Sequence, residues 1–221
     1  SGLTVEPSQV LVTNGGKQAI YSAFATVLDP GDEVIVPAPY WTTYPEAIQL
    51  AGGVPVPVLA DETQGYKVTV EQLEAARTEK TKVLLFVSPS NPTGAAYTRS
   101  ELQALGAVLE KYPSIVIAAD DMYEHIYWAD EPFVSFAEAC PNLYDRTVTI
   151  NGVSKAYAMT GWRIGYAGGP ANLIKAMGTI QSQSTSNPTS ISQYAAVEAL
   201  NGPQDFLPKW AKVFQERRDL V

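Results

Sequence analysis

The sequence predicts an α/β fold: a three-layer sandwich around a mostly parallel, seven-stranded sheet. Short apolar runs that are typical of strands alternate along the chain with longer segments of helical periodicity. Glycine and proline clusters separate these segments, and polar residues follow several of the strand-like runs. Such alternation favours parallel strands joined by helices. The expected strands cover residues 9–12, 33–36, 54–58, 82–87, 115–119, 147–150 and 163–167.

The expected helices lie between these strands. They cover residues 16–28, 44–51, 70–77, 99–111, 171–183 and 190–201, and a further helical run begins at residue 208. Asp29-Pro30-Gly31 ends the first helix and Gly52-Gly53 ends the second, since proline and glycine break the helical pattern. Thr98-x-x-Glu101 has the spacing of a capping box, which predicts the start of the fourth helix.

The composition is that of a folded chain with no bias toward nucleic acid or membrane. Hydrophobic residues make up 46% and charged residues 17% of the 221 positions, and the formal net charge is −8. This charge argues against nonspecific nucleic-acid binding, and no apolar run approaches the roughly 20 residues that span a bilayer. The single cysteine, Cys140, rules out an internal disulfide and fits a reducing compartment. The single histidine, His125, has no second ligand in its pattern, so we expect no metal site.

The most informative segment contains Lys155 and Arg163. Lys155 follows an apolar, strand-like run, where desolvation would lower the pKa of its amine and make it a nucleophile toward carbonyl groups. Arg163 lies a short loop further on and offers a planar, permanently charged group suited to a phosphate. A Schiff-base lysine and a phosphate-binding arginine are two groups that a protein needs to hold pyridoxal phosphate. Taken alone, a surface lysine and a surface arginine are the more common explanation of such a pair.

This segment resembles the cofactor-attachment signature of class I and II aminotransferases, the fold type I enzymes that use pyridoxal phosphate. The family pattern has small residues three before and directly before the lysine, then Gly-x-Arg and a closing glycine. The chain has all of these residues: Gly152, Ser154, Gly161, Arg163 and Gly165. Residues 151–163 are closest to the bacterial aspartate aminotransferase branch called Ib. The resemblance implies that Lys155 is the catalytic residue and, with Arg163, binds the cofactor.

Two further segments match the family at the ends of the first two strands. Gly15-Gly16-Lys17 opens a helix, where glycine lets the backbone approach an anion and the helix start offers free N–H groups. A plain tight turn is the ordinary alternative. The resemblance implies that Gly15, Gly16 and Lys17 bind the cofactor phosphate. Trp41 would stack on the pyridine ring and line the substrate pocket, although tryptophan is more often an ordinary core residue.

Two later segments complete the match. Taken alone, the segment Asn91-Pro92-Thr93-Gly94 is typical of a turn. The resemblance implies that the Asn91 amide contacts the cofactor's ring oxygen and lies near the substrate carboxylate. Asp120 ends an apolar strand, where a carboxylate needs a partner or serves as a helix N-cap. In the family Asp120 would pair with the pyridine nitrogen, and Tyr123 would bind the ring oxygen; Asp121 is the less favoured partner.

The resemblance implies an aminotransferase that moves an amino group between an L-amino acid and a 2-oxo acid, with aspartate or glutamate as first choice. It also implies a homodimer, and the reducing compartment that the single cysteine fits leads us to expect a cytoplasmic protein. Residues 1–207 would form the cofactor-binding large domain, and residues 208–221 would start the connector helix to a small domain that is missing from the chain. The family's arginine for the substrate carboxylate would lie beyond Val221. Two alternatives stay open: a carbon–sulfur β-lyase of the same fold, and a noncatalytic pyridoxal-phosphate-sensing domain of a regulator.

Overall fold

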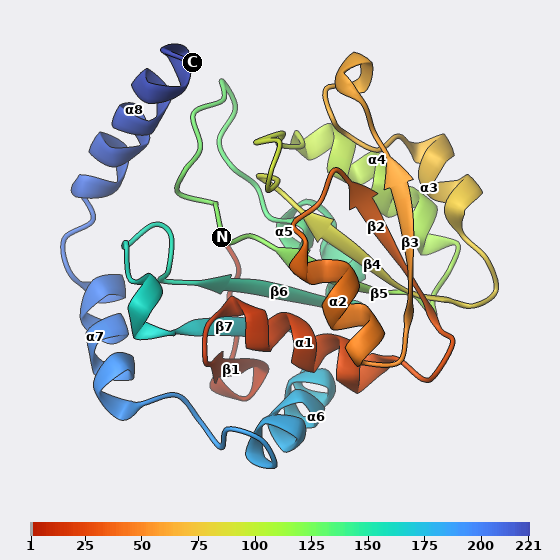
Figure 1. The fold of residues 1–221 in the computed structure, drawn as a ribbon, viewed down its shortest axis with the longest axis horizontal. Helices are drawn as coiled ribbons and strands as arrows, with labels where there is room; N and C mark the ends of the chain where they lie inside the picture. The colour runs from red at the N-terminus through yellow and green to blue at the C-terminus, as the bar shows by residue number, and fades with distance from the viewer. Residues whose placement is uncertain (1) are drawn as a thin grey trace.

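The computed structural model describes residues 2–221 and contains the predicted seven-stranded sheet (Figure 1). The strands are β1 (Val10–Thr13), β2 (Glu33–Ala38), β3 (Val54–Leu59), β4 (Thr81–Val87), β5 (Val116–Asp120), β6 (Thr147–Gly152) and β7 (Gly165–Gly168). All seven predicted strands are confirmed, and their ends lie within two residues of the predicted ones.

The strand order is β1-β7-β6-β5-β4-β2-β3. All strand pairs between β3 and β6 are parallel, whereas β7 runs antiparallel to both of its neighbours, β1 and β6. The first residue of β7, Gly165, therefore pairs with the last residue of β1, Thr13, and with the last residue of β6, Gly152. As a result, the loop between β6 and β7 begins and ends at the edge of the sheet where the parallel strands finish.

Helices cover both faces of the sheet. The helices are α1 (Gly16–Val27), α2 (Thr43–Leu50), α3 (Val70–Ala76), α4 (Arg99–Glu110), α5 (Phe136–Ala139), α6 (Ala171–Ser182), α7 (Ser190–Asn201) and α8 (Phe206–Asp219). One core cluster joins the sheet to α1, α2 and α6, and another joins it to α3, α4 and α5. These are the three predicted layers. In Figure 1, α7 and α8 run along the left edge, outside both layers.

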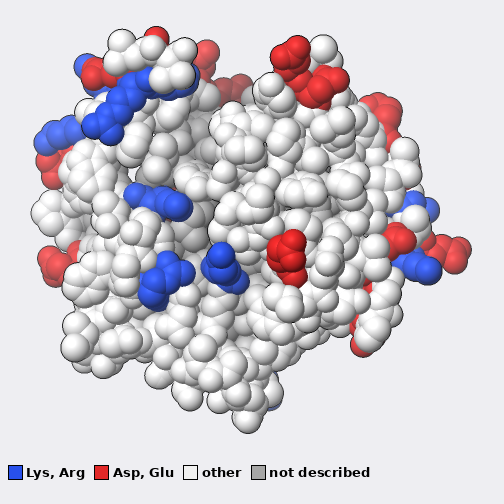
Figure 2. All heavy atoms as spheres, viewed as in Figure 1, with Lys and Arg blue, Asp and Glu red and all other residues white. Residues whose placement is uncertain are grey.

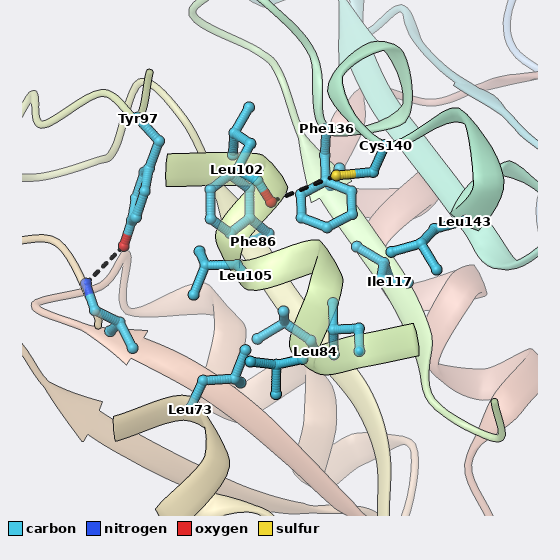
Figure 3. Close-up of a cluster of buried hydrophobic side chains, with 14 of the residues drawn as sticks. Leu73, Leu84, Phe86, Tyr97, Leu102, Leu105, Ile117, Phe136, Cys140 and Leu143 are labelled. Carbon is cyan, nitrogen blue, oxygen red and sulfur yellow. Dashed lines mark hydrogen bonds between the residues drawn. The ribbon is translucent and has the colours of Figure 1, made fainter. Parts of the chain in front are cut away.

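The core under α4 shows how the strand and helix patterns fit together (Figure 3). Phe86 of β4 lies between Tyr97 and Phe136, with ring centroids 4.7 and 5.5 Å away. Leu102 and other apolar residues of α4 pack onto this group. The buried Tyr97 hydroxyl accepts a hydrogen bond from the Val68 N–H at 2.7 Å. This aromatic and leucine packing fixes β4 and β5, whose ends carry two of the predicted site segments.

Helix boundaries follow the predicted signals, with a few additions. The capping box of Thr98 and Glu101 is present, with the Thr98 N–H donating to Glu101 Oε2 at 2.8 Å. Helix α8 begins at Phe206, two residues before the predicted run. The four-residue helix α5 was not predicted, since one turn is too short to show a periodic pattern. Within residues 2–221, no helix is both long and apolar enough to cross a membrane.

Candidate active site

A cavity of about 290 Å³ opens at the edge of the sheet where the parallel strands end. Its walls come from the segments that follow β1, β2, β4, β5 and β6, and from the segment that precedes β7. Ligands of open α/β sheets bind at this edge. Eight of the predicted site residues line the cavity: Gly16, Lys17, Trp41, Asn91, Asp120, Tyr123, Lys155 and Arg163. The ninth, Gly15, lies directly behind the Arg163 guanidinium.

The start of α1 forms a corner of the cavity whose groups suit an anion. Gly15 precedes the helix with a positive φ of 80°, a conformation that glycine adopts without strain. A Cβ atom on Gly15 would lie 2.3 Å from Arg163 Nη2, so the absence of a side chain lets the guanidinium approach the loop. The first N–H groups of a helix lack intrahelical partners and carry partial positive charge. Helix start and guanidinium together suit a phosphate.

Arg163 is held in an unusual backbone conformation. It follows the short 3₁₀ turn Thr160–Trp162 and has a positive φ of 54°, which strains a residue with a side chain. Its Nη1 donates to the Thr160 carbonyl oxygen at 2.9 Å. The chain then enters β7, which is antiparallel and starts at this same edge of the sheet. The Arg163 side chain therefore stays beside the cavity. The sequence prediction placed Arg163 inside a strand; the structure corrects this, because β7 begins two residues later.

Asp120 is the last residue of β5 and is 4% exposed. Its Oδ2 accepts a hydrogen bond from the Tyr44 hydroxyl at 2.9 Å, and its Oδ1 accepts one from the Met122 N–H at 3.0 Å. Burial raises the pKa of Asp120, while these two donors and the charge of Lys155 oppose that rise. Residues 122–125 form a turn rather than a helix, so Asp120 is not a helix N-cap.

Asp121 differs from its neighbour in what surrounds it. It is 1% exposed, does not line the cavity, and its Oδ2 has no hydrogen-bond partner among the described residues. Burial, followed by the nearby charges of Glu124 and Asp120, raises its pKa well above the usual value. Of the two consecutive carboxyl groups, Asp120 is thus the one that faces the cavity.

An amide, a phenol and an amine meet across the cavity. Asn91 Nδ2 donates to the Tyr123 hydroxyl at 3.4 Å, a long hydrogen bond. Lys155 Nζ lies 5.8 Å from the centre of the Tyr123 ring. Burial and the charge of Asp120 raise the pKa of Tyr123, so its hydroxyl stays protonated near neutral pH. These three side chains come from the segments after β4, β5 and β6.

Trp41 is half-buried before the start of α2. Its ring meets the Tyr44 ring edge-on, with centroids 5.5 Å apart and an interplanar angle of 87°. Lys17 Nζ lies 4.9 Å from the centre of the Trp41 ring. Trp41 therefore presents a flat apolar surface to the cavity and is more than a core residue.

The Lys155 side chain is exposed, which differs from the desolvated amine that the strand-end position led us to expect. The difference arises because Lys155 lies three residues beyond the end of β6, in an open loop. The described residues alone do not exclude water from Nζ. A ligand that fills the cavity would have to supply that desolvation.

The sequence interpretation missed several cavity residues, of which Tyr44 is the most connected. It lies three positions after Trp41, and the Tyr44 N–H donates to the Trp41 carbonyl oxygen at 3.0 Å, so one turn of backbone brings the two rings together. This spacing is the signal that could have identified it. The other cavity residues that were not predicted are Ile20, Met122, Ser154 and Thr160.

The cavity is basic although the chain is acidic. Lys17, Lys155 and Arg163 line it, and Asp120 is the one carboxylate among its described lining residues. Figure 2 shows basic side chains around a hollow on this face, while acidic side chains lie mostly toward the periphery. Such a distribution attracts an anionic ligand. Across residues 2–221, no group of His, Cys, Asp and Glu side chains could hold a metal ion.

Comparison with known proteins gives a consistent result. The family profile described as "Aminotransferase class I and II" matches residues 1–221. An aspartate/prephenate aminotransferase of Cereibacter sphaeroides is 62% identical over 221 residues, which are 100% of this chain and 55% of that protein. An aspartate aminotransferase of Streptomyces avermitilis is 57% identical over 222 residues, with 100% and 54% covered. The crystal structure of the aspartate aminotransferase from Rhizobium meliloti superposes with a TM-score of 0.98 at 53% identity, over 100% of this chain and 55% of that one. The chain thus spans about half the length of these relatives.

Proposed function

The chain belongs to the class I and II aminotransferase family, and from this premise we propose that it is the cofactor-binding part of a pyridoxal-phosphate-dependent aminotransferase. The reaction would move an amino group between an L-amino acid and a 2-oxo acid. One observation carries the proposal: an amine, a buried carboxylate and an anion-binding corner line the same cavity, at Lys155, Asp120 and Arg163.

The residues present fit pyridoxal phosphate chemically. The phosphate would bind where the Arg163 guanidinium meets the start of α1, at Gly15, Gly16 and Lys17. A Cβ atom on Gly16 would lie 2.4 Å from Met122 Cε, so a side chain there would crowd the lining of the cavity. A protonated ring nitrogen needs a buried anion, which Asp120 offers.

Side chains that suit the other side of the cofactor ring also line the cavity. The Asn91 amide and the Tyr123 hydroxyl are within 3.4 Å of each other and would both bind a ring oxygen. Trp41 offers a flat surface for stacking and, with Asn91, would contact the substrate. The chemistry of the cavity lining therefore supports pyridoxal phosphate as the cofactor.

When bound, the cofactor supplies an electron sink that stabilises negative charge at the substrate α-carbon. Lys155 Nζ would bond the cofactor and, once free, would remove the proton from that α-carbon and return it to the C4′ atom of the cofactor. Asp120 would keep the ring nitrogen protonated. Arg163 and Lys17 would hold the phosphate in place, which fixes the ring while bonds change.

Substrate choice and assembly are also proposals. Relatives with 52–62% identity are named as aspartate or aspartate/prephenate aminotransferases, which supports aspartate or glutamate as amino donor. We expect a cytoplasmic homodimer. Helix α7 carries exposed apolar side chains, among them Ile191, Tyr194 and Val197, which would suit contact with other protein. Residues 1–207 would form the large domain and residues 208–221 the start of a connector helix.

The first test is a titration of the full-length protein with pyridoxal phosphate, followed by borohydride reduction and peptide mapping. We expect a visible absorbance band and a covalent label on Lys155. Lys155→Ala should abolish the label, whereas Lys175→Ala, which removes an exposed lysine of α6, should leave it unchanged. A label spread over several lysines would refute the assignment.

The second test separates aminotransferase from β-lyase. Aspartate with 2-oxoglutarate should give glutamate, and the reaction should stop when the oxo acid is left out. Release of pyruvate and ammonia from a cysteine-type substrate without an oxo acid would favour the lyase instead.

A further inference from the structure

Tyr44 connects two groups that face the cavity. Its hydroxyl donates to Asp120 Oδ2 at 2.9 Å, and its ring meets the Trp41 ring edge-on at 5.5 Å. The side chain is 2% exposed, so its position is fixed by packing. Tyr44 belongs to α2, whereas Asp120 is the last residue of β5. Strands β3 and β4 lie between α2 and β5 in the sequence, so this contact joins distant parts of the chain.

The Asp120 carboxylate has two donors, one for each oxygen. Oδ1 accepts from a backbone N–H, that of Met122, which any residue at that position would supply. Oδ2 accepts from the Tyr44 side chain, which is therefore the donor that depends on residue type. Hydrogen bonds to a charged acceptor fix its geometry and stabilise the charge.

We propose that Tyr44 is a positioning residue that holds Asp120 as an oriented anion, so that Asp120 pairs with a protonated ring nitrogen in the cavity. This inference rests on the proposed function, because it requires a ligand with such a nitrogen. Tyr44 does not touch the reacting atoms in this assignment; it acts through Asp120.

The burial of Asp120 explains why a second donor matters. Burial raises the pKa of this carboxyl and so favours its neutral form, which binds a cationic ring poorly. Burial also raises the pKa of Tyr44 well above its usual value, so the hydroxyl keeps its proton and stays a donor. Without the hydroxyl, Oδ2 would lose the one side-chain donor that the described residues give it.

The alternative is that Tyr44 is an ordinary core tyrosine whose hydroxyl needs some partner. Both explanations predict that Tyr44→Phe loses stability. They differ in what the substitution does to ligands with and without a ring nitrogen, and in whether its effect depends on Asp120.

The experiment measures equilibrium binding to the full-length protein of pyridoxal phosphate and of its 1-deaza analogue, in which C–H replaces the ring nitrogen. Tyr44→Phe keeps the ring packed against Trp41 and removes the hydroxyl alone. We expect it to weaken pyridoxal phosphate binding about tenfold to a hundredfold. Binding of the deaza analogue should change less than about twofold, because that ring has no positive charge for Asp120 to meet.

Two further variants complete the design. Tyr97→Phe removes another buried hydroxyl, which bonds the Val68 N–H and does not line the cavity, and should leave the ratio of the two affinities unchanged. In an Asp120→Ala background, Tyr44→Phe should have no additional effect on pyridoxal phosphate binding, since the residue through which it acts is gone.

The possible outcomes are distinct. Equal losses for both ligands, or additive losses in the double variant, would overturn the role of Tyr44 and leave the proposed function standing. If the wild-type protein bound neither ligand, the proposed function itself would fail, and the inference with it.

Discussion

Replacing Gly165 with alanine should disturb both the fold and the site, because Gly165 lies where three segments meet. It pairs with Thr13 at the end of β1 and with Gly152 at the end of β6. A Cβ atom on Gly165 would lie 2.3 Å from the Gly16 backbone nitrogen and 2.4 Å from the Gly15 carbonyl carbon. Both are backbone atoms, so no flexible side chain can move aside.

The size of the effect follows from these distances. Ordinary contact begins near 3.4 Å, so the loop would have to move by about 1.1 Å, the difference between 3.4 and 2.3 Å. Overpacking of this kind costs about 1–3 kcal/mol of unfolding free energy. The atoms that must move include the helix-start N–H group that we assign to the phosphate. We therefore also expect weaker binding of pyridoxal phosphate.

Urea unfolding of the cofactor-free protein gives the first quantity, and an absorbance titration gives the second. Gly178→Ala is the matched control, because Gly178 lies inside α6. A Cβ atom there would contact only Leu11 Cδ1, at an ordinary distance of 3.8 Å. Alanine in a helix should leave stability equal or higher by up to about 1 kcal/mol. If Gly165→Ala kept both stability and cofactor affinity at the wild-type level, the reasoning from close packing would be wrong.

Three other predictions concern stability and reactivity. Thr98→Ala removes the side-chain half of the capping box with Glu101 and should cost about 1 kcal/mol in urea unfolding; an unchanged midpoint would contradict the capping role. Burial raises the pKa of the Cys140 thiol to about 11, so a thiol reagent at pH 8 should label it only as fast as the protein unfolds, and rapid labelling of the folded protein would contradict this. Because burial and Glu124 raise the pKa of Asp121, the folded state binds this proton more tightly than the unfolded state, and stability falls as the pH rises above the usual value of 3.8. Asp121→Asn should therefore stabilise the cofactor-free protein more at pH 7 than at pH 4.5, and an equal effect at both would count against the shift.

The order of strands and helices could be predicted from the sequence because each signal is local. Val148 and Ile150 alternate with polar residues in a strand of six, and Thr98 with Glu101 marks a helix start within four positions. Boundaries therefore fell within two residues of the observed ones. The same residues do not specify the pairing of strands, and the antiparallel direction of β7 could not be read from its four residues.

Most of the site residues could be predicted individually from the sequence, but the contacts between them could not. The resemblance identified eight of the residues that line the cavity, Asp120 and Lys155 among them, because each belongs to a recognisable segment. It did not identify Tyr44, which carries no motif of its own and matters through a hydrogen bond to a residue 76 positions away. The exposure of Lys155 was also unexpected, since exposure depends on the loop path after β6 and not on the strand itself.

The antiparallel β7 also has a consequence for the order in which the site is assembled during folding. Lys155 and Arg163 lie on one loop, which is closed by the β6–β7 hairpin. Lys17, in contrast, lies 146 positions before Arg163 in the sequence. Closing a short loop loses less chain entropy than closing a long one, so the hairpin contacts are kinetically favoured. The pairing of β1 with β7 joins distant parts of the chain and is the slower step. A phosphate held between Arg163 and the start of α1 would bridge this non-local contact, and the ligand would thereby stabilise the closing edge of the sheet by mass action.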